Sequence, residues 1–282
     1  MARMPSGTEK SPIVSPFAEG GPGRHLKARL AAGDVLVGGI LTEYARPSLM
    51  KIYRQAGFDF LYIETEHTLI QPSALSDTVL AARDNGLPAI AKIPQLERAA
   101  TAKLLDCGIV GIQLPRAETR DQIETLRDYM KFPPAGSRAV APGFGNSDYG
   151  RELNYGRFMA DQDAESTLVV HIETRKGYEN AEEIVSTPGV DMVYVGPGDF
   201  SVEMGQPGDW DHPDVVAPAE EILDLCKAHS VPFGTTAAGI EGAGRWISKG
   251  ARFFEAQDEL GFIYEGAVQL VGAYRALIAG SG

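Results

Sequence analysis

The segment FLYIETEH, residues 60–67, carries the pattern that decides the fold: a short apolar run is followed at once by charged and titratable side chains. The pattern recurs from residue 35 onward, with amphipathic stretches of helical length between the runs. Alternation of this kind indicates repeated βα units, and eight units close a barrel. The sequence therefore predicts eight strands, at 35–41, 60–63, 89–93, 111–114, 168–172, 192–195, 232–235 and 252–256, with helices between them that include 72–85, 119–129, 214–229 and 241–249.

The predicted fold class is α/β, a (β/α)8 TIM barrel. An open doubly wound sheet has the same alternation and is the alternative. Against that alternative, no glycine-rich dinucleotide fingerprint follows the first strand, where the chain reads LTEY at 41–44. We expect residues 1–24, rich in Pro, Gly and Ser, to be a flexible tail and residues 25–282 to be a single catalytic domain. The Pro- and Gly-rich segment 131–165 is expected to be a loop on the active-site face.

Composition excludes several partners. The chain has 282 residues and a formal net charge of -12, which repels nucleic acid and anionic membrane surfaces. No apolar run approaches the roughly 18 residues that cross a bilayer. Two cysteines, Cys107 and Cys226, are too few for a disulfide framework and suggest a reducing cytoplasm. The expected partners are small molecules, with no nucleic acid and no membrane.

The chemistry is expected where each strand ends, because a barrel enzyme builds its active site from the carboxyl ends of its strands and the loops that follow. Six of the predicted strands have residues suited to chemistry or ligand binding at or just after their carboxyl ends: Glu64 and His67; Lys92; Arg116; His171 and Glu173; Gly198 and Asp199; and Thr236. Acids, bases and a cation are thus predicted to meet at one rim.

Glu173 and Asp199 follow consecutive strands, which lie about 4.8 Å apart in a parallel sheet. Two carboxylates so close repel each other unless a divalent cation neutralises both, and oxygen ligands with room for water and substrate favour Mg²⁺, Mn²⁺ or Co²⁺. The alternative is structural: Glu173 pairs with Arg175 or Lys176, and Asp199 caps the helix after it.

His67 follows two acids, Glu64 and Glu66, and either could orient its ring and raise its basicity. A surface histidine that caps the next helix is the alternative. Lys92 lies within a predicted strand, so a buried cation there needs an anionic partner, either a rim acid or a substrate carboxylate. A Schiff base on Lys92 also remains possible.

These segments together resemble the HpcH/HpaI aldolase and citrate lyase family, specifically its metal-dependent class II pyruvate aldolases, such as 4-hydroxy-2-oxoheptanedioate aldolase, and also macrophomate synthase. The likeness runs from about residue 30 to the C-terminus. It is carried by GFDFLYIETEH at 57–67, FPPAGSR at 132–138, HIETR at 171–175 and VGPGDFS at 195–201.

The resemblance implies a (β/α)8 barrel, a homo-hexamer built as a trimer of dimers, and exchange of the last helix, about 264–278, between subunits. It implies that Glu173 and Asp199 ligate the metal and that His67 acts as base with Glu64. The amides around Gly198 and Asp199, with Lys92, would hold the carboxylate of pyruvate. The implied reaction cleaves or forms 4-hydroxy-2-oxo acids through a metal-stabilised pyruvate enolate, and the aldehyde half of the pocket is expected from residues 135–163.

Three positions depart from the family pattern. The family usually has Arg where Lys92 stands, Asp where Glu64 stands and Gln where His171 stands; His171 is therefore a candidate substrate-binding residue. The ammonium group of Lys92 is a point charge, whereas the guanidinium of arginine would form two parallel hydrogen bonds with a carboxylate. These departures leave other readings open: oxaloacetate decarboxylation, cleavage of an acyl-CoA, or a barrel that binds a carboxylate without turnover.

Overall fold

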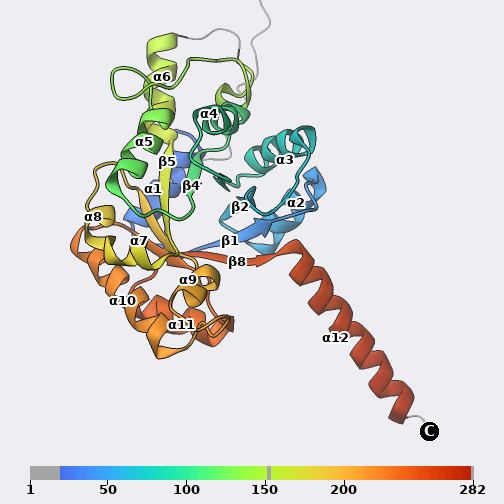
Figure 1. The fold of residues 1–282 in the computed structure, drawn as a ribbon. Helices are drawn as coiled ribbons and strands as arrows, with labels where there is room; N and C mark the ends of the chain where they lie inside the picture. Colours follow the sequence, from blue (N-terminus) through green and yellow to red (C-terminus); the bar gives the residue numbers. More distant parts are fainter. Residues whose placement is uncertain (1–19, 151–153, 281–282) are drawn as a thin grey trace, which may run out of the picture.

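A computed structural model describes residues 20–150 and 154–280, and its eight strands form one closed parallel barrel in chain order (Figure 1). The strands are β1 Leu36–Leu41, β2 Phe60–Glu64, β3 Ala89–Lys92, β4 Gly111–Leu114, β5 Thr167–Ile172, β6 Met192–Val195, β7 Phe233–Thr235 and β8 Phe253–Asp258. Their bounds lie within two residues of the predicted ones. The predicted (β/α)8 barrel is confirmed.

Twelve α-helices and one 3-10 turn complete the described part of the chain. They are α1 Pro22–Ala31, α2 Pro47–Ala56, α3 Pro72–Asp84, α4 Arg98–Cys107, α5 Arg120–Met130, η1 Gly145–Ser147, α6 Tyr155–Glu165, α7 Arg175–Glu179, α8 Ala181–Val185, α9 Pro197–Glu203, α10 Pro213–Ala228, α11 Gly239–Lys249 and α12 Glu259–Gly280. Several begin at proline, which suits the first turn of a helix because the ring fixes φ and no amide hydrogen is needed there.

Two buried clusters match the two faces of the barrel wall. The larger cluster joins outward-facing strand residues such as Ile63 and Val170 to the surrounding helices. The smaller fills the interior with large side chains such as Phe60 and Phe253, whose rings stack with centroids 4.2 Å apart. Alternate residues of each strand thus serve opposite faces, so polar residues at interior positions must lie inside the barrel.

Helix α1 begins within the segment expected to be a tail. Residues 1–19 of that segment lie outside the described residues, but Pro22–Ala31 is helical. Its first amides are satisfied by Glu165, whose Oε2 accepts hydrogen bonds from the Gly23 amide at 2.6 Å and the Arg24 amide at 3.2 Å. A cap from a residue so distant in sequence leaves no local signal for the start of this helix.

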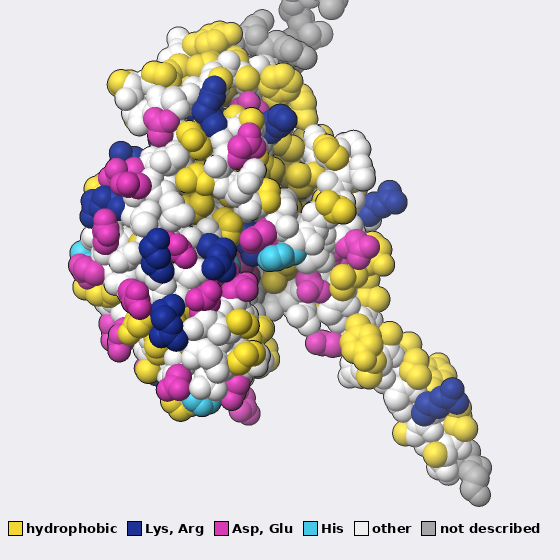
Figure 2. Space-filling view, viewed as in Figure 1, with side chains coloured by type: hydrophobic (Ala, Val, Ile, Leu, Met, Phe, Trp, Pro, Cys, Tyr) yellow, Lys and Arg dark blue, Asp and Glu magenta, His cyan; other side chains and the backbone are white. Residues whose placement is uncertain are grey.

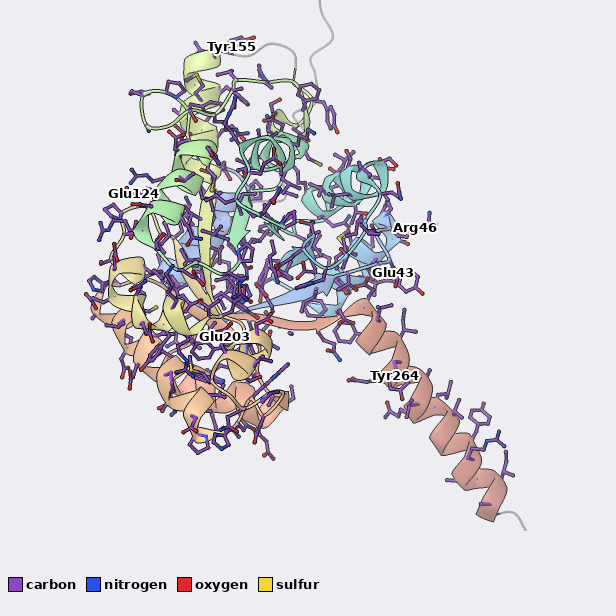
Figure 3. All side chains as sticks on the ribbon, in the orientation of Figure 1. Glu43, Arg46, Glu124, Tyr155, Glu203 and Tyr264 are labelled. Carbon is purple, nitrogen blue, oxygen red and sulfur yellow. The ribbon has the colours of Figure 1, made fainter. Side chains whose placement is uncertain are left out.

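The prediction that 131–165 is a loop on the active-site face is wrong. The segment joins α5 to β5, so it lies at the opposite, amino-terminal end of the strands, and it contains η1 and α6. Tyr155, at the start of α6, lies far from Glu203 at the end of α9 (Figure 3). Proline and glycine content indicates irregular backbone but does not tell a βα from an αβ connection. None of the described residues of this segment, 131–150 and 154–165, lines the cavity described below.

Helix α12 projects away from the barrel, and hydrophobic side chains cover much of its length (Figures 1 and 2). Phe262 still contacts the barrel, where it packs against Tyr53 and Phe58. Farther along, Tyr264, Leu270 and Leu277 are more than half exposed. No helix within residues 20–150 and 154–280 is long and apolar enough to span a membrane. Both cysteines are free thiols.

Candidate active site

A cavity of about 320 Å³ opens at the carboxyl ends of the strands. Its lining includes all eight residues that the sequence analysis singled out for catalysis, substrate or metal: Glu64, His67, Lys92, His171, Glu173, Gly198, Asp199 and Thr236. They come together because the ends of β2, β3, β5 and β6 and the residues after β7 share one rim of the barrel.

Lys92 is the buried cation at this rim. It ends β3 in register with Glu64 of β2, and only 4% of its surface is exposed. Its Nζ lies 2.7 Å from Glu66 Oε2 and 3.2 Å from Glu64 Oε2. Burial alone would lower the pKa of Lys92, but Glu66, Glu64 and Glu173 outweigh it and raise that pKa above its usual value. Lys92 is therefore charged, and the anionic partners predicted for it are acids of the rim.

The two acids before His67 have different tasks. Glu64 Oε1 accepts hydrogen bonds from the backbone amides of Glu66 at 2.6 Å and His67 at 3.2 Å, which fixes the turn after β2. The ring of His67 instead lies next to Glu66, with Nε2 3.6 Å from Oε2. His67 is largely exposed at the mouth of the cavity. Glu66, which lies next to both His67 and Lys92, was predicted only as one of two acids that could orient His67.

Glu173 is the most deeply placed acid of the rim, with 2% of its surface exposed. Its Oε1 accepts a hydrogen bond from the Arg116 amide at 2.8 Å. Burial raises the pKa of Glu173 to about 7; Lys92 and the Arg116 amide work against this rise, and the carboxylates of Asp199 and Glu66 add to it. The structural alternative for Glu173 is not found, because neither Arg175 nor Lys176 pairs with it: Arg175 bonds to Glu203 and Lys176 to Glu118.

His171 lies beneath Glu173 and is almost fully buried. Its Nδ1 is 3.2 Å from the Gln113 amide nitrogen, and its Nε2 is 3.2 Å from Glu173 Oε2. Burial, assisted by Lys92, lowers the pKa of His171 well below its usual value, so the ring is neutral. Because the Gln113 amide donates, Nδ1 accepts and the proton resides on Nε2, which makes no hydrogen bond in the described part of the chain. A Cβ at Gly196 would lie 2.0 Å from this Nε2, so only glycine fits there.

The turn after β6 presents Gly198 and Asp199 to the cavity. Both are exposed, and a Cβ added to Gly198 would meet no atom within 4 Å. Space for a ligand is thus open above the backbone here. Thr236 is less available, because its hydroxyl donates to the Glu255 carbonyl at 2.8 Å and lies 2.5 Å from the Tyr194 hydroxyl.

Interior residues were missed by looking only at strand ends. Tyr62, Tyr194 and Glu255 lie one step deeper on β2, β6 and β8, yet they line the same cavity. The available signal was a charged residue, Glu255, at an interior position of the last predicted strand. Within residues 20–150 and 154–280, no group of three or more His, Cys, Asp and Glu side chains is arranged to hold a metal ion. The predicted pair of carboxylates would have to share a metal with water and substrate.

Comparison with known proteins places the chain in a family. Residues 39–262 match the family model described as HpcH/HpaI aldolase/citrate lyase, and the chain belongs to this family. It is 28% identical over 249 residues to 5-keto-4-deoxy-D-glucarate aldolase of Shigella sonnei, a match that covers 88% of this chain and 96% of the relative.

Solved structures agree with this assignment. An HpcH/HpaI aldolase from Desulfitobacterium hafniense superposes with a TM-score of 0.84 at 26% identity, covering 89% of this chain and 96% of that one. Macrophomate synthase superposes with a TM-score of 0.79 over 94% and 95% of the two chains; at 21% identity, this likeness is one of fold. The predicted family is confirmed, and with it the prediction that the protein is a carbon–carbon lyase of the aldolase type.

Proposed function

We propose that the protein is a divalent-metal-dependent aldolase that cleaves or forms 4-hydroxy-2-oxo acids, with Glu173 and Asp199 as the protein ligands of the metal. The observation that carries the proposal is the charge balance of the cavity. Three carboxylates, of Glu64, Glu66 and Glu173, act on one buried cation, Lys92, and the carboxylate of Asp199 adds its negative charge near Glu173. Such an excess of negative charge is stabilised by a bound dication.

The donor set fits a hard divalent ion. Glu173 and Asp199 offer carboxylate oxygens, which suit Mg²⁺, Mn²⁺ or Co²⁺. Glu173 Oε2 makes no hydrogen bond to a backbone amide, in contrast to Oε1, and the space above Gly198 is open. The high pKa of Glu173 also fits, since a cation would replace the proton that this carboxyl holds near neutral pH.

The bound metal would supply Lewis-acid stabilisation of the negative charge that develops on the oxo acid. The protein's own groups handle positioning and the proton. In the cleavage direction His67, oriented by Glu66, removes the proton of the 4-hydroxyl as the C3–C4 bond breaks and an aldehyde leaves. Lys92, fixed by Glu64 and Glu66, adds a positive charge for the oxo acid. The neutral His171, whose Nε2 lies 3.2 Å from Glu173 Oε2 without a hydrogen bond, places no positive charge beside that carboxylate.

Substitution of the two ligands tests the assignment. We expect Glu173→Ala and Asp199→Ala each to lower kcat/KM for metal-dependent pyruvate release by at least about a thousandfold, because two ligands cannot be reduced to one without loss of the ion. Asp224→Ala, at an exposed acid of α10, serves as the control. Calorimetric titration with Mn²⁺ should show the same loss of binding. Full activity after treatment with EDTA, with borohydride trapping on Lys92, would instead establish a Schiff-base route.

A panel of substrates tests the reaction type. Pyruvate release is measured from 4-hydroxy-2-oxo acids of increasing length, from oxaloacetate and from malyl-CoA. We expect the hydroxy-oxo acids to be cleaved with the highest kcat/KM. Preference for oxaloacetate would show that the protein is a decarboxylase. Preference for malyl-CoA would show that it cleaves an acyl-CoA in the same cavity.

We also propose that α12 packs on another copy of the chain, in a homo-hexamer, and that the protein works in the cytoplasm. The exposed apolar residues of α12 support the exchange, since a single chain leaves them in water. The barrel has a complementary surface: Val37 of β1, Ile52 of α2 and Ile247 of α11 are exposed near the gap where an eighth outer helix would lie. A second α12 would cover them. The two free thiols fit a reducing compartment.

A further inference from the structure

One part of the cavity is left free by the groups of the proposed function. The metal, the oxo acid and the base take the sector at the ends of β2, β3, β5 and β6, which contains Glu64, His67, Lys92, Glu173 and Asp199. The remaining lining comes from β1, β8 and the segments after β6 and β7, and it includes Ile40, Pro197, Trp210 and Ala256. No described residue of 131–165 lines the cavity, so the aldehyde half falls to this remaining part.

Trp210 has the largest side chain of this remaining part. It is partly exposed and lines both the cavity and a crevice of about 10 Å³ that is bounded by Phe200, Val215 and Trp246. The indole therefore stands between the cavity and apolar side chains of α9, α10 and α11. The crevice also touches the ends of β6 and β7, which lie across the barrel from β2 and β3. Trp210 is thus on the side of the mouth opposite Lys92.

The segment that carries Trp210 is fixed to the rim. Ser201 of α9 is fully buried, and its hydroxyl donates to the Gly198 carbonyl at 2.7 Å and accepts from the Gly208 amide at 3.0 Å. Asp211 Oδ1 accepts a hydrogen bond of 2.6 Å from an arginine of α11, which attaches the other side of the segment. Because the residues on both sides of Trp210 are held in this way, its indole is ordered before a ligand arrives, and little entropy is lost when one packs on it.

The charges of the cavity disfavour an anionic second substrate. Its described lining contains one lysine, Lys92, and no arginine. The carboxylates at the rim are those of Glu64, Glu66, Glu173, Asp199 and Asp258. Their negative charges exceed the positive charges of Lys92 and a divalent metal together, and the oxo acid adds a further negative charge. Arg116 lies outside the lining and pairs with Glu203 at 3.4 Å. A carboxylate on the aldehyde would therefore meet like charge without a counterion in the described lining.

We propose that the aldehyde partner is uncharged and that its apolar substituent packs against Trp210. The inference rests on the proposed function, in which His67 handles the proton of the 4-hydroxyl from the side of β2. Because C4 of the product is tetrahedral, its substituent points away from that hydroxyl, and the far side of the mouth, where Trp210 lies, is the space open to it. An apolar group there covers indole surface that water otherwise contacts, and each buried methylene can change kcat/KM roughly tenfold.

A matched pair of aldehydes, 4-isopropylbenzaldehyde and 4-formylbenzoate, tests the charge. The isopropyl group has the shape of a carboxylate and withdraws no electrons, so a preference for it cannot come from a more reactive carbonyl. Condensation with saturating pyruvate and Mn²⁺ gives kcat/KM for each aldehyde, and we expect the uncharged one to exceed the anion at least about tenfold. Asp258→Asn removes one rim charge but keeps an acceptor for the Gly261 amide, and it should reduce this ratio at least about threefold. Preference for 4-formylbenzoate that Arg116→Met abolishes would show an anionic substrate bound by Arg116 and overturn the proposal.

Two substitutions of Trp210 test the contact. The ratio of kcat/KM for benzaldehyde to that for acetaldehyde should fall at least about tenfold in Trp210→Ala, because the phenyl group loses its wall while the methyl group has little to lose. In Trp210→Phe, which keeps an aromatic ring, most of the ratio should remain. Because both constants come from one preparation, partial loss of folded protein cancels in the ratio. An unchanged ratio in Trp210→Ala would show that the substituent does not lie there and would overturn the proposal.

Exchange of the methyl protons of pyruvate into D₂O separates this inference from the proposed function, since it reports enolate formation without any aldehyde. If metal-dependent exchange occurs but the charged and uncharged aldehydes react equally well, the aldolase proposal stands and the inference about the aldehyde fails. If neither exchange nor condensation occurs with Mn²⁺ or Mg²⁺ present, the proposed function fails and the inference that rests on it fails too.

Discussion

At the scale of single residues, Glu173 couples folding to pH. Its pKa rises from 4.5 to about 7 on folding, so the folded protein holds this proton more tightly than the unfolded chain. The resulting stabilisation is present below about pH 4.5 and is lost as the pH rises through 7. Without metal, wild type should therefore lose about 3 kcal/mol of unfolding free energy between pH 4.5 and 8 relative to Glu173→Gln, which cannot ionise.

Urea unfolding of the metal-free proteins at a series of pH values measures this difference. Other titrating groups are common to both proteins and cancel. Added Mn²⁺ should stabilise wild type at pH 8 and leave Glu173→Gln nearly unaffected, because only the carboxylate binds the ion strongly. Parallel pH profiles for the two proteins would contradict the assigned pKa.

Among the residues of the rim, Lys92 is the one whose substitution should lower the free energy of unfolding most. Its Nζ compensates Glu64 and Glu66 inside the barrel, and removal of one partner of a buried pair leaves charge uncompensated. We expect Lys92→Met to lower the unfolding free energy by about 3 kcal/mol at pH 7 and Lys92→Arg to lower it by less. Lys103→Met, on the exposed face of α4, should change it by no more than about 0.5 kcal/mol. Denaturant titration that found Lys92→Met as stable as this control would show that the acids do not depend on the lysine.

The sequence could locate the site residues but not their pairings. Strand ends of a barrel must converge, so eight predicted residues were found around one cavity. Which carboxylate meets the ring of His67 depends on the turn after Glu64, whose side chain binds backbone amides and leaves the ring to Glu66. Glu255 was missed because an interior position is recognised only once the register of β8 is known.

At the scale of elements, the strands were predictable because burial on both faces makes each one a short apolar run. The connections between strands and helices could not be predicted from the sequence in the same way. The cap of α1 by Glu165 is the clearest case, since Oε2 of Glu165 accepts from two amides of α1 and Oε1 binds Arg24 Nε at 3.0 Å. Gly21 leaves room for that carboxyl and Gly23 for the backbone carbonyl of Glu165, because a Cβ at either position would collide with these oxygens.

Substitution of Glu165, which caps α1, should lower the free energy of unfolding measurably. Glu165→Ala should lower the unfolding free energy by about 2 kcal/mol, because two helix amides lose their acceptor and Arg24 loses a partner. Glu124→Ala, at an exposed acid of α5 (Figure 3), should have an effect within about 0.5 kcal/mol. Circular dichroism during urea unfolding provides both values. Equal stability of the two variants would mean that the Glu165 cap contributes little and that other contacts of α1, such as those of Leu26 and Leu30, hold it.

At the scale of the whole molecule, the position of α12 makes association testable. The helix leaves apolar residues in water along its length, and the proposed exchange would bury them on another copy. We expect light scattering at micromolar concentration to give a hexamer for the intact chain. Leu270→Asp should shift it to smaller species, because each buried charge would be unpaired at every copy of the interface. Gln269→Asp adds the same charge beside it without removing apolar surface and should shift the distribution less. A monomeric intact chain, or equal effects of the two substitutions, would mean that α12 does not mediate assembly and that the barrel performs its chemistry alone.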